Sequence, residues 1–191
     1  MIITAPGLLV VLGAAAQASP ALELLPCRLP GVDQELRCGV YQVWENRAAR
    51  AGRRIPLRVV LLPALGPAPE PDPLVILEGG PGASNVAAIG RFAATPLRHR
   101  RHLLFVDARG TGSSAPLDCA FRFEQPMGFL RTFLPLPQIR ACRDSLARHA
   151  DLTQYVTPNV VDDLDDVRQA LGIPQVTLWG SSGGTRQALV W

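Results

Sequence analysis

Three short apolar runs, each followed by a turn that contains glycine, constrain the fold of this chain most strongly. They are Leu74–Leu77, Leu103–Val106 and residues 176–179, and stretches with helical spacing separate them. Strands that are buried on both faces of a parallel sheet read as continuous apolar runs of this kind. Strands that alternate with helices indicate a parallel sheet. We therefore predict an α/β fold with a mostly parallel sheet.

The remaining elements are placed around these runs. We predict two further strands at 40–44 and 55–62, a proline-rich loop at 63–73, and helices at 85–98 and 185–191, whereas 113–157 is an excursion with two cysteines. A helix at 157–171 is well marked, because Thr157 is a capping residue, Pro158 suits the first helical position and Gly172 follows the end.

Four aspartates lie in the N-terminal half of that last helix, where negative charge complements the helix dipole. They are Asp162, Asp163, Asp165 and Asp166. A calcium site would need a loop that wraps the cation, and this pattern lies on one helix. We therefore predict a solvated face.

The first residues indicate export. Residues 5–16 are apolar, and the run closes on Ala16-Gln17-Ala18, which is typical of a signal-peptide cleavage site. No lysine or arginine precedes Arg28, so the amino terminus alone would supply the positive charge. We predict that residues 1–18 are a signal peptide and that the protein is periplasmic or secreted. The alternative is a buried N-terminal segment.

The four cysteines agree with export. They are Cys27, Cys38, Cys119 and Cys142, an even number without a C-x-x-C pair. Four cysteines allow three pairings, of which the sequential one, Cys27–Cys38 and Cys119–Cys142, is the simplest. Free thiols become the better interpretation only if the chain is not exported.

Composition excludes several classes of protein. With 48% hydrophobic and 18% charged residues the chain can form a packed core. The chain has 19 arginines, no lysine and 16 acidic residues, which gives a net charge of +3. This charge is too small to indicate a nucleic-acid partner. No unbroken apolar stretch is long enough to predict a membrane-spanning helix.

The candidate chemistry lies where the third apolar run meets a helix. Gly180-x-Ser182-x-Gly184 at a strand–turn–helix junction is the pattern of a nucleophile elbow. A sharp turn lifts the serine hydroxyl above the sheet, and the backbone N–H of Gly183 would stabilise the oxyanion that forms on attack. The alternative is a loop that binds phosphate without covalent chemistry. No lysine follows, which excludes the P-loop version.

A second oxyanion donor is expected from the loop after an upstream strand. Glu78-Gly79-Gly80-Pro81-Gly82 follows the first apolar run. We prefer the N–H of Gly80 as donor, with Gly79 beside it. A plain Gly-Pro turn is the alternative.

Together with Asp107-x-Arg109-Gly110-Thr111-Gly112-Ser113, these motifs resemble the proline iminopeptidase and tripeptidyl aminopeptidase family of α/β-hydrolases, particularly its secreted, disulfide-bearing members. The resemblance covers about residues 36–191. It implies that Ser182 is the nucleophile, that Gly80 and Gly183 form the oxyanion hole, and that Asp107 and Arg109 are structural. In two places the chain departs from the family, with Glu78 where many relatives carry histidine and Gly183 where many carry a bulky residue.

A serine hydrolase also needs a histidine base and an acid that orients it. In α/β-hydrolases both follow the serine, but His99, His102 and His149 all precede Ser182, and no Asp, Glu or His follows it. We therefore expect residues 19–191 to be the N-terminal part of a hydrolase domain, without the later strands and the cap, and to be inactive alone.

The sequence thus predicts a serine hydrolase, and the resemblance implies an exopeptidase that releases residues from peptide N-termini. An esterase or lipase of the same fold, or an inactive remnant, are the alternatives. The expected partner is a peptide or small ester substrate. No metal or cofactor is required by this chemistry.

Overall fold

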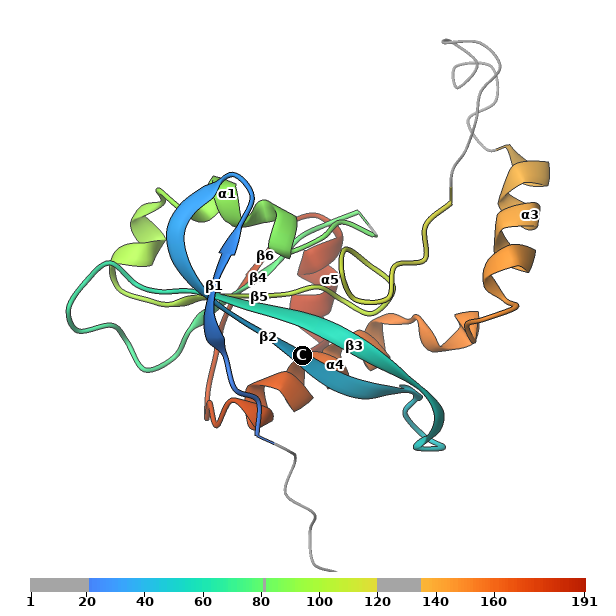
Figure 1. The fold of residues 1–191 in the computed structure, drawn as a ribbon, viewed down its shortest axis with the longest axis horizontal. Coiled ribbons are helices and arrows are strands. Elements are labelled where there is room, and N and C mark those ends of the chain that lie inside the picture. The colour runs from blue at the N-terminus through green and yellow to red at the C-terminus, as the bar shows by residue number, and fades with distance from the viewer. Residues whose placement is uncertain (1–20, 81, 120–134) are drawn as a thin grey trace, which may run out of the picture.

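The computed structural model describes residues 21–80, 82–119 and 135–191, which build a six-stranded mixed sheet in the order β1-β2-β3-β5-β4-β6 (Figure 1). The predicted signal peptide, residues 1–18, lies outside the described residues. The strands are β1 (Leu25–Leu29), β2 (Val32–Asn46), β3 (Ala51–Leu62), β4 (Leu74–Leu77), β5 (Leu103–Val106) and β6 (Thr177–Gly180).

The first three strands form an antiparallel meander. β2 and β3 pair along most of their length, with Tyr41 opposite Leu57 and Val43 opposite Ile55. Both strands extend beyond the predicted ranges 40–44 and 55–62, and β1 was not predicted. The reason for the longer β2 is that Leu36 continues its alternation of buried and exposed residues toward the N-terminus.

The other strands are short and buried, as their apolar sequences predict. β4 and β5 have the predicted bounds, and β6 lies one residue later than the predicted 176–179. β4 pairs in parallel with both β5 and β6, whereas β3 pairs antiparallel with β5. The carboxyl ends of β4, β5 and β6 therefore meet at one edge of the sheet, and the glycine-bearing turns follow them there. In the described residues β6 is the last strand of the sheet, and its four residues are only half-buried.

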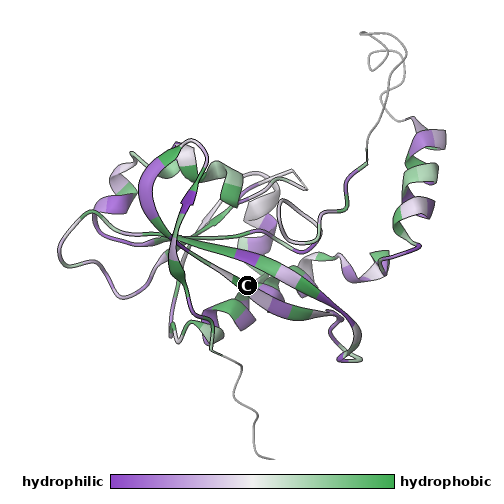
Figure 2. Cartoon of the chain, viewed as in Figure 1, coloured by the Kyte–Doolittle hydropathy of each residue, from purple (hydrophilic) through white to green (hydrophobic). Residues whose placement is uncertain are grey.

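Helices cover both faces of the sheet. On one face α4 (Thr157–Ala170) packs Leu164 and Val167 against a cluster that includes Val75 and Leu104. On the other face α1 (Ile89–Phe92) packs against Ile76 and Phe105. Adjacent residues of β4 and β5 thus point into different clusters, which explains why these strands contain no polar residue. Figure 2 shows the apolar colour concentrated along the central strands.

The helix predicted at 85–98 is wrong. Three short pieces replace it: the 3-10 helices Val86–Ala88 and Pro96–His99, and α1 between them. Thr95 has extended backbone angles, φ −77° and ψ 148°. A proline disfavours the helical conformation of the residue before it, so Pro96 ends the helical run.

The helix predicted at 157–171 is present, but its first cap differs. Val156 is the N-cap, in an extended conformation, and no side chain caps the helix there. Thr157 is therefore the first helical residue and Pro158 the second. Gly172 follows the C-terminal end with φ +68°, the left-handed conformation that glycine adopts most readily. The last helix, α5 (Gly183–Val190), begins two residues before the predicted 185.

Two disulfides are present, and they follow the sequential pairing. Cys27–Cys38 joins β1 to β2. Cys119–Cys142 joins the loop after β5 to α3 (Leu136–Leu146). No residue of α3 is buried, and Figure 1 shows α3 projecting from the body. Disulfides of this kind are typical of extracellular or periplasmic proteins. Among the described residues no helix has the length and apolarity to cross a membrane.

Candidate active site

Ser182 lies at the turn between β6 and α5 in a strained backbone conformation. Its φ is +47° and its ψ −118°, and only two other described residues that are not glycine have positive φ. Serine adopts such angles only when its surroundings impose them. The residue is exposed, and its side chain makes no cap hydrogen bond to α5. No described residue makes a hydrogen bond with this hydroxyl group, which lies at the edge where the parallel strands end.

Glycines let the strands and the helix approach each other at this turn. A Cβ atom on Gly184 would overlap the carbonyl oxygen of Leu77 at the end of β4. A Cβ on Gly180 would lie 3.0 Å from the backbone of Gly184. Both glycines of the elbow motif are thus required by close packing of backbone on backbone.

The loop after β4 lies directly against the elbow. A Cβ on Gly79 would lie 2.7 Å from Cβ of Ser182, and one on Gly183 would lie 3.6 Å from the carbonyl oxygen of Gly80. Gly80 itself has φ +112°, which strongly favours glycine. The fold therefore brings the nucleophile candidate Ser182 together with Gly80 and Gly183, which were predicted to form the oxyanion hole, and with the adjacent Gly79.

Asn85 holds this loop, and the sequence did not single it out. Its Oδ1 accepts a hydrogen bond from the N–H of Glu78 (2.7 Å), and its Nδ2 donates one to the carbonyl of Val106 (2.6 Å). Asn85 is 3% exposed, so its amide replaces solvent for two buried backbone groups at the ends of β4 and β5. Nothing in the local sequence distinguishes it from an ordinary polar loop residue.

Asp107 connects the same loop to the turn after β5. Its Oδ1 accepts hydrogen bonds from the Ser84 hydroxyl (2.7 Å) and the Val86 N–H (3.0 Å), and its Oδ2 accepts one from the Ser113 N–H (2.9 Å). The carboxylate is 1% exposed. These contacts agree with the structural role that the family resemblance implies.

Arg109 is fully enclosed behind the site. Its guanidinium binds Asp163 through two hydrogen bonds of 2.7 Å and also donates to the carbonyls of Glu45 and Gln154. Arg47 donates a further hydrogen bond of 2.7 Å to Asp163. Asp163 is thus buried between two arginines, and the prediction of a solvated acidic face is wrong for this residue. A spacing pattern along one helix does not show that two distant arginines reach it.

All three of the other aspartates of α4 also pair with arginines, Asp162 through an ion pair of 3.4 Å with Arg47. Asp166 accepts from Arg47 (2.8 Å) and Asp165 from Arg168 (2.7 Å). Asp162 is the exposed member, with 59% of its side chain accessible. No group of three or more potential metal ligands occurs in the described part of the chain.

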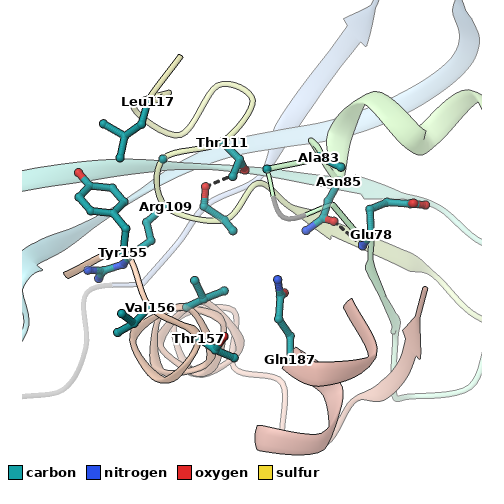
Figure 3. Close-up of a pocket in the computed structure, with 15 residues that line it drawn as sticks. Glu78, Ala83, Asn85, Arg109, Thr111, Leu117, Tyr155, Val156, Thr157 and Gln187 are labelled. Carbon is teal, nitrogen blue, oxygen red and sulfur yellow. Dashed lines mark hydrogen bonds between the residues drawn. The ribbon is translucent and has the colours of Figure 1, made fainter. Parts of the chain in front are cut away.

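A cavity of about 240 Å³ lies beside the elbow (Figure 3). The loops after β4 and β5, the beginning of α4 and the side chain of Gln187 on α5 form its walls. Gly79 belongs to both the cavity wall and the contact with Ser182. The walls are mostly small or apolar, with Tyr155 at one side. Burial and the hydrogen bond to Glu45 raise the pKa of the Tyr155 phenol, so this hydroxyl stays protonated.

Glu78 is among the residues that line the cavity, but its carboxylate points away from the cavity centre in Figure 3. Its Oε1 lies 2.8 Å from Nη2 of Arg91 and has no geometrically sound hydrogen bond. We read this contact as an ion pair. Glu78 therefore does not occupy the place of a base at Ser182.

None of the three histidines is at the site. His99 and His102 precede β5, at the opposite edge of the sheet from the elbow. Nδ1 of His102 accepts a hydrogen bond from the N–H of Ala64 (3.1 Å), and burial, with Arg37 nearby, lowers the pKa of His102. His149 follows α3 and offers its backbone carbonyl to Arg53.

Arginines lie beside these histidines in the sequence, and one of them, Arg98, is buried rather than solvated. This residue is 5% exposed and donates to the carbonyls of Pro63 and Ala93. Arg100 and Arg101 pair with Glu70 and Asp72.

The sheet begins with antiparallel strands, Ser182 has a strained backbone at the turn after β6, and a glycine loop packs on that turn. This arrangement is typical of a hydrolase fold. The model of the α/β hydrolase fold family matches residues 72–191, and the chain belongs to this family.

Its curated relatives are peptidases by name. The chain is 32% identical to the serine protease Hip1 of Mycobacterium tuberculosis over 93% of its own length and 38% of that protein. It is 29% identical to a tripeptidyl aminopeptidase of Streptomyces lividans, over 82% of this chain and 32% of that one. It is also 29% identical to a proline iminopeptidase of Xylella fastidiosa, over 64% of this chain and 28% of that one. The chain thus spans less than two fifths of the length of these relatives.

Among solved structures, a proline iminopeptidase of Mycobacterium smegmatis aligns with 79% of this chain and 38% of its own, at a TM-score of 0.47 and 22% identity.

Proposed function

We propose that this chain carries the nucleophile and the oxyanion hole of a serine peptidase that acts on peptide N-termini. Ser182 is the nucleophile in this proposal, and the N–H groups of Gly80 and Gly183 bind the oxyanion. The observation that carries it is the positive φ of Ser182 at an exposed strand–helix turn, against which Gly79 is packed. The names of the curated relatives support a peptidase rather than another hydrolase.

The chemistry follows from this geometry. Oγ of Ser182 attacks the carbonyl carbon of the scissile bond while its proton passes to a base, and the negative charge moves to the carbonyl oxygen. Backbone N–H groups at the start of α5 and in the loop after β4 lie beside Ser182, where they can stabilise that charge. The tetrahedral intermediate then collapses, the amine leaves with a proton returned by the base, and water hydrolyses the acyl-enzyme.

The base must come from a histidine other than His99, His102 and His149, because the fold holds these away from Ser182. We therefore expect no turnover from the 191 residues alone. The predicted signal peptide at 1–18 and export to the periplasm or the medium belong to the same proposal, and the two disulfides support them.

The test is covalent labelling of the protein as it occurs in the native organism. A fluorophosphonate probe should label Ser182, and mass spectrometry of the digested protein should locate the adduct there. Ser182→Ala should abolish labelling and hydrolysis of peptide anilides, whereas the neighbouring Ser181→Ala should retain both. A native protein that the probe does not label would contradict the proposal and favour an inactive remnant.

The choice between peptidase and esterase is made with paired substrates. Proline anilide, tripeptide anilide and nitrophenyl esters are compared by kcat/KM with the same preparation. A peptidase should cleave an anilide of a free peptide, and hydrolysis of the esters alone would show that the same fold serves an esterase.

A further inference from the structure

The cavity beside the elbow is large enough for part of a substrate. The volume of about 240 Å³ is many times the roughly 10–15 Å³ that a cavity needs to hold one water molecule. Because Gly79 forms a wall of the cavity and also contacts Ser182, a group that fills the cavity lies next to the acyl carbonyl of a bound substrate.

One buried side-chain oxygen in this cavity wall has neither a hydrogen bond nor an ion pair with any described residue. Gln187 extends from α5 into the cavity (Figure 3), five residues after Ser182 in the sequence. Its Oε1 is buried and accepts no hydrogen bond, and no hydrogen bond joins its side-chain amide to any other described residue. A buried amide oxygen without a hydrogen bond costs free energy unless something binds it.

The other amide and guanidinium groups of the cavity wall already have partners. Asn85 uses both ends of its amide on Glu78 and Val106. Arg109 is occupied by Asp163 and backbone carbonyls. The second buried oxygen without a hydrogen bond, Oε1 of Glu78, has the charge of Arg91 beside it. Gln187 is thus the group in this wall that is left for a ligand.

The chemistry of a primary amide indicates the ligand. It offers one acceptor and two donors, and rotation about its terminal bond can present either end to the cavity. A peptide group matches it, because a peptide group offers both an N–H and a carbonyl. A fatty acyl chain offers neither, and an ester group offers acceptors only.

We propose that Gln187 is a specificity-determining residue that binds the peptide group immediately N-terminal to the residue bearing the scissile carbonyl. The inference rests on the proposed function, and it narrows the substrate class. The acyl portion of the substrate then contains at least two amino-acid residues, joined by a peptide bond whose N–H donates to Gln187.

The experiment removes that N–H from the substrate. The native full-length protein is assayed with a dipeptidyl anilide and with its depsipeptide analogue, in which oxygen replaces the internal N–H. We expect kcat/KM to fall about tenfold for the analogue, the factor that one lost hydrogen bond to a buried group gives. Gln187→Met should bring the ratio of the two constants close to one. Gln175→Met, an exposed glutamine before β6, should keep the wild-type ratio.

Equal kcat/KM for both substrates in the wild-type protein would overturn the inference without any variant. A ratio that stays near ten in Gln187→Met would overturn it as well. In both cases Ser182 remains labelled by the fluorophosphonate, so the proposed function stands. Failure of labelling would instead overturn the proposed function.

Discussion

Ser182 is strained because its neighbours fix it. The residue is followed at once by α5, and its own Cβ lies against Gly79. Positive φ costs a residue with a Cβ about 1–3 kcal/mol, whereas glycine adopts it freely. The strain is therefore a measurable property of the elbow.

We predict that Ser182→Gly is about 1 kcal/mol more stable to unfolding than Ser182→Ala, because only glycine relieves the left-handed strain while both remove the hydroxyl. Urea denaturation of the two variants measures the difference. Equal stabilities would show that the backbone of the elbow is relaxed in solution.

At the scale of elements, the approach of α5 to β4 decides whether the site forms. The first turn of α5 lies on the carbonyl end of β4, where Gly184 leaves no room for a side chain. The N–H of Ser181 also donates to the carbonyl of Leu77 (3.0 Å), so the elbow continues the parallel ladder by one bond. Any displacement of α5 moves Gly183 and Gln187 together.

We predict that Gly184→Ala destabilises the protein by about 1–3 kcal/mol and prevents labelling of Ser182, because the new methyl group overlaps the Leu77 carbonyl. Gly90→Ala is the matched control. Gly90 is exposed in α1 with nothing within 4 Å of an added Cβ, so alanine there should be neutral or slightly stabilising. Thermal unfolding and labelling follow both variants, and a stable, fully labelled Gly184→Ala protein would contradict the packing argument.

At the scale of the whole molecule, the two disulfides serve different parts. Cys27–Cys38 lies in the sheet, and Cys38 belongs to the buried cluster that α1 covers. Cys119–Cys142 holds α3, which buries no residue of its own against the body. The first bond therefore affects the core, and the second affects only the position of a helix.

We predict that replacing Cys27 and Cys38 by serine lowers the free energy of unfolding by about 3 kcal/mol. The reason is that a disulfide closing a loop of this size reduces the entropy of the unfolded chain by about that much. Replacing Cys119 and Cys142 should change the unfolding midpoint of the sheet little and should abolish amide-exchange protection in α3. Hydrogen-exchange mass spectrometry separates the two effects. Loss of protection in β4 and β5 after the second replacement would refute this division.

Elements whose signals are local could be predicted from neighbouring residues alone. Leu74–Leu77 and Leu103–Val106 are strands with the predicted bounds. A strand buried on both faces is a continuous apolar run, so it can be recognised without knowing which segments pack against it. The motif at Gly180–Gly184 placed Ser182 at a strand–helix turn, since the two glycines and the serine specify backbone geometry directly. The prediction of one helix over 85–98 was wrong, because Pro96 disfavours the helical conformation of the residue before it and the apolar spacing does not reveal this.

Which side chains contact one another could not be predicted from the sequence, because it depends on how distant segments pack. Asp163 looked like one of four solvated carboxylates, yet Arg47 and Arg109 reach it from positions more than 50 residues away in the sequence. Asn85 and Gln187 carried no sequence signal, because their roles depend on where β4, β5 and α5 end relative to one another. Local backbone preferences depend on neighbouring residues in the sequence. The burial of a side chain, its ion pairs and a hydrogen-bonding group left without a partner arise only when distant segments pack together.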